Sequence, residues 1–121
     1  MVQQPGGIVQ SVYDLIQRQL GGARVTDVES PEITTVGLTS VVLFRLKAAR
    51  LAFVVVNLSA NVLFLRPGRP ATTSAGIRLA PNGGSLVVAW NDDLLLPARE
   101  WQVISDAGAA NAVYNLEILL A

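Results

Sequence analysis

The sequence predicts a mainly β fold, a β-sandwich or jelly roll of about seven to eight short antiparallel strands with one N-terminal amphipathic helix. Three observations carry this prediction. Short apolar segments rich in β-branched residues recur along the chain, turn residues separate them, and a helical period appears only near the N-terminus. A chain of 121 residues is expected to form one core. We expect an arm and helix at residues 1–24 and a β-sandwich domain at residues 25–121.

The predicted helix spans Ile8–Leu20, where apolar residues recur with a helical period. Glycine pairs lie on both sides, and Gly21-Gly22 is a typical helix stop. Packing of the helix on its own sheet is favoured. The alternative is an arm that docks on a neighbouring subunit, since the glycines would let it swing. Four residues of the apolar stripe are predicted to form an interface: Ile8, Val12, Ile16 and Leu20.

Two extended segments are expected before the apolar centre of the chain. Val25–Gly37 is polar and β-branched with Pro31 in its middle, which indicates an extended connector or an edge strand. Val41–Lys47 alternates between apolar and basic side chains over its second half. The side chains predicted to point inward are Val42, Phe44 and Leu46, and those predicted to point outward are Arg45 and Lys47.

The segment from Leu51 to Leu65 is almost entirely apolar. It is too short for a transmembrane helix, which needs about 20 continuous apolar residues, and its valines and phenylalanines favour strands. Turn-forming residues interrupt it at Asn57–Asn61. We therefore predict a β-hairpin with strands at Leu51–Asn57 and Asn61–Arg66.

Both faces of this predicted hairpin are apolar. Phe53 and Val55 lie on one face of its first strand, whereas the other face carries Ala52, Val54 and Val56. A strand with one face in water normally alternates between apolar and polar residues. We therefore expect a second sheet to cover one face and a helix or a neighbouring subunit to cover the other. Phe53 and Val55 are predicted to be interface residues.

The rest of the chain is predicted to add short strands separated by turns. The expected strands are Ile77–Leu79, Ser85–Trp90, Leu94–Leu96, Trp101–Ile104 and Val113–Leu120. Arg66–Gly76 is expected to be a loop because its two prolines lie too close together for a central strand. Arg66 and Arg69 of this loop are candidate interface residues that could hold an anion or a partner's carboxylate, although a solvated loop is favoured.

The composition excludes several kinds of chemistry. The chain has no cysteine, which removes disulfides and thiol chemistry, and no histidine, which removes the commonest general base and metal ligand. A formal net charge of +0 argues against a nucleic-acid-binding protein. The N-terminus lacks the pattern of a secretory signal. We expect no catalytic site, metal site or cofactor, so the chain is predicted not to be an enzyme and not to bind nucleic acid or a membrane.

Two groups of residues carry weaker signals. Asp92 and Asp93, with Glu100, could supply oxygen ligands to calcium, but such carboxylates between strands are ordinary turn chemistry, and the turn is favoured. Trp90 and Trp101 could form a platform for a sugar ring. Each lies at an alternating position inside an apolar strand, so packing in the core is favoured.

Three stretches of the chain together resemble a pattern found in small structural proteins of tailed bacteriophages. They are an Asn/Ser turn at Asn57–Asn61, a Gly-Ile-x-Leu-x-Pro step at Gly76–Pro81 with a following Gly-Ser turn, and a final strand pair that ends in Asn-Leu-Glu-Ile-Leu. The resemblance covers Asn57–Ala121 and leaves out the N-terminal helix. Asn82–Ser85 is longer than the usual turn of this pattern, and Trp90–Asp93 adds a polar corner.

The resemblance implies a non-enzymatic virion structural protein, with a capsid decoration or cement protein favoured. Its implied partners are copies of itself, with a trimer favoured, and other virion proteins such as the major capsid protein. A tail, baseplate or fibre component is the alternative within this class. A glycan- or receptor-binding β-sandwich is another, but the candidate loops Arg66–Gly76 and Ser105–Ala110 contain no aromatic residue. A charged fraction of only 15% agrees with a surface partly buried in an assembly.

Overall fold

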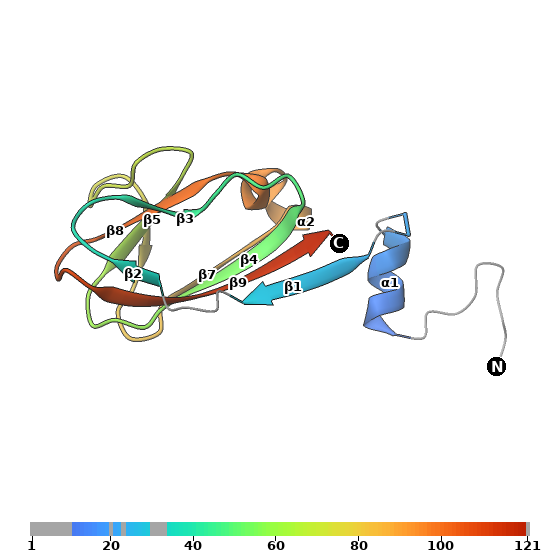
Figure 1. Cartoon of the computed structure of the whole chain (residues 1–121), viewed down its shortest axis with the longest axis horizontal. Coiled ribbons are helices and arrows are strands. Elements are labelled where there is room, and N and C mark those ends of the chain that lie inside the picture. Colours follow the sequence, from blue (N-terminus) through green and yellow to red (C-terminus); the bar gives the residue numbers. More distant parts are fainter. Residues whose placement is uncertain (1–10, 20, 23, 30–33, 121) are drawn as a thin grey trace, which may run out of the picture.

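The computed structural model describes residues 11–19, 21–22, 24–29 and 34–120, and its fold is mainly β. Two antiparallel sheets pack together as a β-sandwich (Figure 1), as the sequence predicts. The described part of the chain contains nine strands, slightly more than expected.

The first sheet has the strand order β1-β9-β4-β7, and β2 also pairs with β9. Its strands are β1 (Val25–Glu29), β2 (Thr34–Val36), β4 (Arg50–Asn57), β7 (Ser85–Ala89) and β9 (Asn111–Leu120). The second sheet has the order β3-β8-β5-β6. Its strands are β3 (Val41–Phe44), β5 (Leu63–Pro67), β6 (Ile77–Leu79) and β8 (Trp101–Ser105). The helices are α1 (Val12–Gln19), α2 (Trp90–Asp93) and the short 3-10 helix η1 (Leu96–Ala98).

The hydrophobic core takes side chains from both sheets. The ring centroid of Phe53 on β4 lies 5.2 Å from that of Trp101 on β8 and 4.4 Å from that of Phe44 on β3. Further apolar residues without exposed surface are Val36, Val55, Leu63, Leu65, Val103 and Val113. Burying a side chain of this size contributes about 1.5–3 kcal/mol. This cluster therefore holds the two sheets together.

The two apolar strands at the centre of the chain do not form the predicted hairpin. β4 pairs with β7 and β9 in the first sheet, whereas β5 pairs with β6 and β8 in the second. The connection between them is an arch that passes from the first sheet to the second. The buried Asn57 side chain holds this arch: its Nδ2 donates to three backbone carbonyls, and its Oδ1 accepts from the N–H and hydroxyl of Ser59. The three carbonyls belong to Asn61, Leu79 and Ala80.

The inward and outward faces of β3 also differ from the prediction. Phe44 is buried as expected, but Val42 and Leu46 are exposed rather than inward-facing. The pairing of β3 with β8 shifts register between Val42 and Phe44, and such a bulge interrupts the alternation of side chains. The strand then ends at Phe44, so Leu46 lies beyond it.

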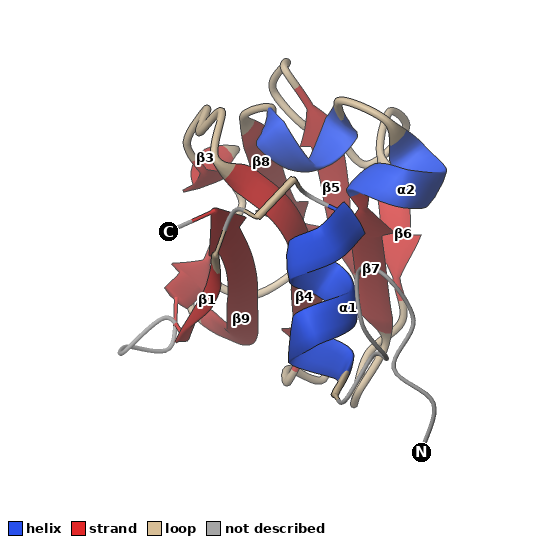
Figure 2. Ribbon diagram, turned by 90° about the vertical axis from the view of Figure 1, so that its right-hand side faces the viewer, coloured by secondary structure: helices blue, strands red, loops and turns tan. Residues whose placement is uncertain are grey.

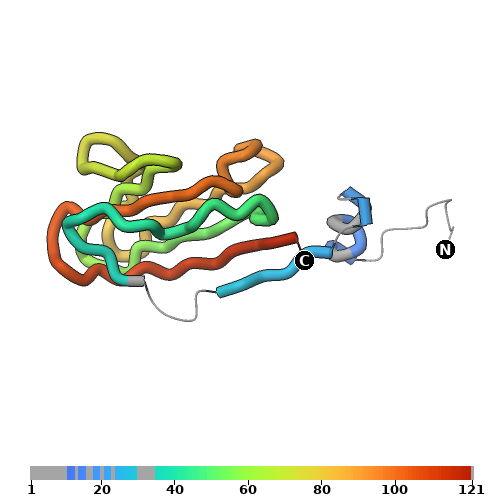
Figure 3. Tube along the Cα trace, turned by 45° about the horizontal axis from the view of Figure 1, so that its top comes forward, coloured from blue at the N-terminus to red at the C-terminus, as the bar shows by residue number. Residues whose placement is uncertain are grey.

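The helix α1 stands beyond one end of the sandwich (Figure 1), and in Figure 2, where that end faces the viewer, it is drawn in front of β4 and β7. The tube in Figure 3 shows the same separation as Figure 1 from another direction. At its start the Ser11 hydroxyl accepts the backbone N–H of Asp14. The sequence favoured packing of this helix on its own sheet, but the described part projects past the sheet instead. The amphipathic helix predicted over Ile8–Leu20 is not confirmed over that length. Of its four predicted interface residues, Ile8 and Leu20 lie outside the described residues, as does the side chain of Ile16.

Candidate interaction surface

The outward face of the first sheet is apolar across three neighbouring strands. In the sheet register, Val54 of β4 lies between Val87 of β7 and Leu116 of β9. The row of Ala52 is also apolar, because it pairs with Ala89 and Ile118, whereas Val56 lies between Ser85 and Tyr114. The residues of this surface, called the outer face below, are Ala52, Val54, Val56, Val87, Ala89, Leu116 and Ile118.

The outer face is much less buried than the opposite face of the same sheet. Phe53 and Val55 point into the core and are 0% exposed, whereas Val54 is half-buried and Val87 is 61% exposed. Among the described residues no helix lies across these strands in the side view of Figure 1. The first sheet therefore has two apolar faces and, in the described part of the chain, only one cover.

Acidic side chains on β1 line one margin of the outer face. Asp27 lies opposite Ile118 in the register, and Glu29 lies opposite Leu116. The Tyr114 hydroxyl donates a hydrogen bond to the Glu29 carboxylate at 2.5 Å. This hydrogen bond, assisted by desolvation and by the nearby negative charges, raises the pKa of Tyr114 above its ordinary value. The hydrogen bond ties β1 to β9 beside the apolar surface.

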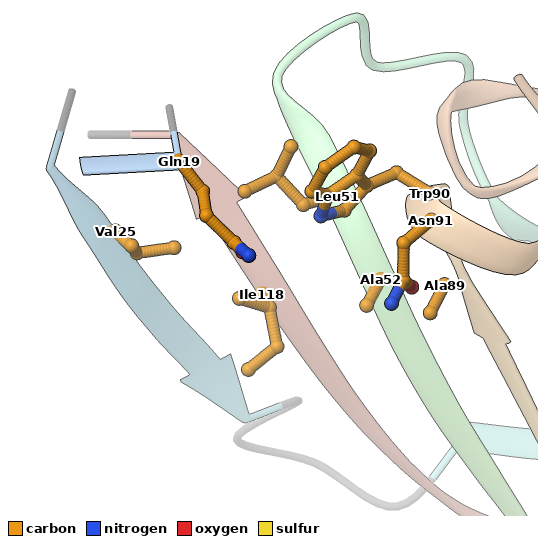
Figure 4. Close-up of a pocket in the computed structure, with 8 residues that line it drawn as sticks. All are labelled: Gln19, Val25, Leu51, Ala52, Ala89, Trp90, Asn91 and Ile118. Carbon is orange, nitrogen blue, oxygen red and sulfur yellow. The ribbon is translucent and has the colours of Figure 1, made fainter. Parts of the chain in front are cut away.

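A cavity of about 130 Å³ lies at the end of the outer face nearest to α1. Figure 4 shows Val25, Ala52 and Ile118 projecting from neighbouring strands toward it, with Gln19 of α1 at the rim. Its lining is apolar apart from the side-chain amides of Gln19 and Asn91. The last residue of α1 thus comes close to the outer face at one end, while the rest of the helix extends away.

The helix α1 also carries apolar side chains that its own chain leaves in solvent. Val12 is 73% exposed and Leu15 is 43% exposed. The sequence predicted Val12 to be an interface residue, and its exposure leaves it available for that role. Whether it takes part in an interface stays a prediction.

Trp90, Leu94 and Leu95 form a second apolar surface, called the leucine corner below. Leu94 and Leu95 are each 78% exposed, and Trp90 is 41% exposed. The strand expected at Leu94–Leu96 is instead the turn after α2 followed by the first residue of η1. The core position predicted for Trp90 is therefore wrong, whereas Trp101 is buried as predicted. The sequence pattern at this corner is a run of three leucines that ends at a proline, and the same pattern is also typical of a short strand.

The structure separates the remaining predicted interface residues. Phe53 and Val55 face the second sheet, so their prediction as interface residues is wrong: they cover the inner face of β4. The Arg66 guanidinium donates to the Pro70 carbonyl oxygen at 3.4 Å, and Arg69 is exposed in the loop after β5. This loop belongs to the second sheet, so the two arginines are not part of the outer face. Their role as an anion or partner site stays a prediction.

The acidic residues near α2 contribute to the local backbone. The Asp93 carboxylate accepts the backbone N–H of Ala89 at 2.9 Å, as expected for a turn residue. Within the ranges that the structure describes, no group of three or more acidic side chains is placed to hold a metal ion. No helix in the described residues is both long and apolar enough to cross a membrane.

Comparison with known proteins identifies a similar fold and no family. No family model and no curated protein matches the sequence. A solved chain from the endospore appendages of Bacillus, which are described as disulfide-linked pili, superposes with a TM-score of 0.53 at 14% sequence identity. The match covers 82% of this chain and 91% of that chain. At this identity the likeness concerns the fold alone.

Proposed function

We propose that this chain is a non-enzymatic structural protein that assembles with copies of itself, and that the outer face is a contact surface of the assembly. The observation that carries the proposal is the outer face itself, an apolar surface on three strands that no helix covers in the described part of the chain. An extended apolar surface on a protein commonly marks an interaction site. Its exposed residue Val87 lies on the edge strand β7, where a neighbour can reach it.

The proposed occupant of the outer face is α1 of a second copy. Val12 and Leu15 leave the helix with an apolar side that its own sandwich does not bury. A helix laid on a sheet covers the apolar surfaces of both elements at once.

Within this class the specific proposal is a virion protein of a tailed bacteriophage, acting as a capsid decoration protein. The sequence pattern at Asn57–Asn61 and Gly76–Pro81 supports it, since it resembles the turns of such proteins. Its partners would be copies of itself, in a trimer, and the major capsid protein, and its location would be the virion. A tail, baseplate or fibre component is the alternative within the same class.

The fold likeness to a pilus protein is compatible with self-assembly and favours no particular particle. The appendages from which that chain comes are described as disulfide-linked, whereas the present chain contains no cysteine. Disulfides therefore cannot join its copies. Their contacts would depend on buried apolar area, which raises the importance of the outer face.

The matched variants Val87→Lys and Val87→Thr test the proposal. Because Val87 is 61% exposed, either change should alter the stability of the single chain by no more than about 0.5 kcal/mol. Burying the rest of this side chain in a contact would contribute about 1–2 kcal/mol. We expect Val87→Lys to abolish assembly through the outer face and Val87→Thr, which keeps the shape, to weaken that contact about tenfold.

The measurement is the solution mass over a range of concentrations, with thermal unfolding as a control for folding. Val12→Asp should give the same loss of assembly if α1 of a second copy occupies the outer face. An assembly that forms equally well in Val87→Lys and in wild type would refute the role of the outer face. Loss with Val87→Lys but not with Val12→Asp would reject α1 as the occupant.

A further inference from the structure

The backbone at the leucine corner adopts a conformation that leucine rarely takes. Leu94 has φ 57° and ψ −114°, where a side chain larger than glycine's meets steric resistance. Hydrogen bonds hold this geometry: the Leu94 N–H donates to the Trp90 carbonyl oxygen at 3.1 Å, and Asp93 fixes the start of the turn. Strained backbone held in place by its surroundings occurs preferentially at binding sites. Here the strain accompanies two leucines that the chain leaves in solvent.

The residues after the two leucines anchor the corner to the core. The Trp101 indole N–H donates to the Leu96 carbonyl oxygen at 2.8 Å. The buried Arg50 guanidinium donates to the carbonyl oxygens of Pro97 and Arg99 at 3.1 and 3.2 Å. Leu94 and Leu95 therefore form a ridge with a fixed base. A rigid ridge loses little conformational entropy when a partner binds.

Two open grooves adjoin this ridge, and Leu94 and Leu95 line both of them. One, of about 500 Å³, runs past Leu51, Trp90 and Ala98. The other, of about 660 Å³, lies between Asp93 and Arg99. A ridge beside grooves is self-complementary, because a two-fold axis can place the ridge of each copy in a groove of the other.

The charges around the ridge match the same arrangement. Asp92 and Arg99 are both exposed and lie before and after the leucines in the sequence, and Asp93 and Arg99 line the same groove. A two-fold axis through the ridge would bring Arg99 of one copy toward Asp92 of the other. Opposite charges placed in this way favour pairing of two identical surfaces.

We infer that the leucine corner is a second self-contact, at which two copies pair about a two-fold axis with Leu94 and Leu95 of each in a groove of the other. The inference rests on the proposed self-assembly, but it uses residues other than those of the adjoining outer face. Two separate contacts of this kind would connect oligomers into a larger array rather than stop at one closed ring.

The test compares self-association of the full chain by sedimentation velocity for Leu94→Gly, Leu95→Ala and the matched control Leu58→Ala. Leu58 is also an exposed leucine, at 49%, but it follows the far end of β4. Leu94→Gly relieves the positive φ while removing the side chain. We expect it to keep the melting temperature of the single chain and to raise the dissociation constant of pairing about tenfold or more. Leu95→Ala should act alike on pairing, and Leu58→Ala should leave it unchanged.

A charge exchange tests the two-fold geometry independently. Asp92→Arg alone and Arg99→Asp alone should each weaken pairing, and the double variant should restore it, because the exchanged charges again face each other across the axis. Equal pairing of wild type and Leu94→Gly would overturn the inference. So would a monomeric wild type whose corner binds phosphatidylcholine vesicles instead. If Val87→Lys weakens self-association and the corner variants do not, the inference fails and the proposed function stands. If the corner variants weaken self-association and Val87→Lys does not, the role of the outer face is rejected and the corner contact stands.

Discussion

The buried Arg50 side chain allows a quantitative test of how the sandwich and the leucine corner depend on each other. Arg50 is 3% exposed, and its guanidinium lies 5.0 Å from the centre of the Phe44 ring. It donates to the Glu117 carboxylate at 2.6 Å and to the Arg45 carbonyl oxygen at 2.8 Å, besides the carbonyl oxygens of Pro97 in η1 and Arg99 after it. One side chain thus links β4, β9, the end of β3 and the corner.

We predict that Arg50→Met lowers the free energy of unfolding by about 3–5 kcal/mol, the range for breaking a buried ion pair. Three carbonyl oxygens would lose a charged donor, and each such hydrogen bond is worth about 1.5–3 kcal/mol. Glu117 limits the cost, because its side chain is 17% exposed and water can partly hydrate it. Domains of this size have a total stability of about 5–15 kcal/mol, so the effect should be large.

The assay is equilibrium unfolding in urea, followed by tryptophan fluorescence because Trp101 lies in the core. Arg50→Lys is the matched control: it keeps the charge but loses the planar fork, so we expect a loss of about 2–3 kcal/mol. Arg50→Met should also weaken pairing at the corner, since Pro97 and Arg99 lose their anchor. A loss below about 1.5 kcal/mol for Arg50→Met would show that these hydrogen bonds do not hold the fold as described.

Two further predictions concern single side chains. Because the hydrogen bond to Glu29 raises the pKa of Tyr114, this interaction stabilises the folded state below the unfolded-state pKa of about 10 and is lost as the pH rises through the folded-state value. Subtracting the ultraviolet absorbance titration of Tyr114→Phe from that of wild type isolates the ionisation of Tyr114, and its midpoint should lie above pH 10. The midpoint should fall in the Glu29→Gln variant, and an unshifted midpoint in wild type would contradict the contact. Asn57→Ala should cost about 3 kcal/mol or more, because it leaves the buried carbonyl oxygens of the arch without their donor. Unfolding in urea measures this loss, and a change below about 1 kcal/mol would mean that the arch does not need Asn57.

The sequence predicted the fold class and many strand positions because alternation and turn residues are local signals. The apolar faces of Leu51–Asn57 were predicted correctly, with Phe53 and Val55 on one side and Val54 on the other. The pairing of these strands was not, since an arch and a hairpin share the same pattern of apolar runs around a turn. The arch differs from a hairpin in the carbonyl oxygens to which the Asn57 side-chain amide donates. Two of these acceptors belong to residues more than 20 positions away in the sequence.

The candidate surface was predictable only in part for the same reason. The second apolar face of β4 was visible as a lack of polar alternation, which indicated that something must cover it. Which face meets the second sheet depends on the whole sheet, so Phe53 and Val55 were assigned to an interface although they lie in the core. The leucine corner depends on the positive φ at Leu94, a conformation that no leucine-rich sequence predicts.

The most direct measurement of the central claim is the solution mass of the full chain by light scattering after size exclusion, for wild type beside Val87→Lys. The proposed assembly requires a stable oligomer for wild type and, for Val87→Lys at an unchanged melting temperature, no species larger than the two-copy pair that the leucine corner allows. A wild type that stays monomeric at every concentration would contradict it, and so would a Val87→Lys variant that forms the same oligomer as wild type.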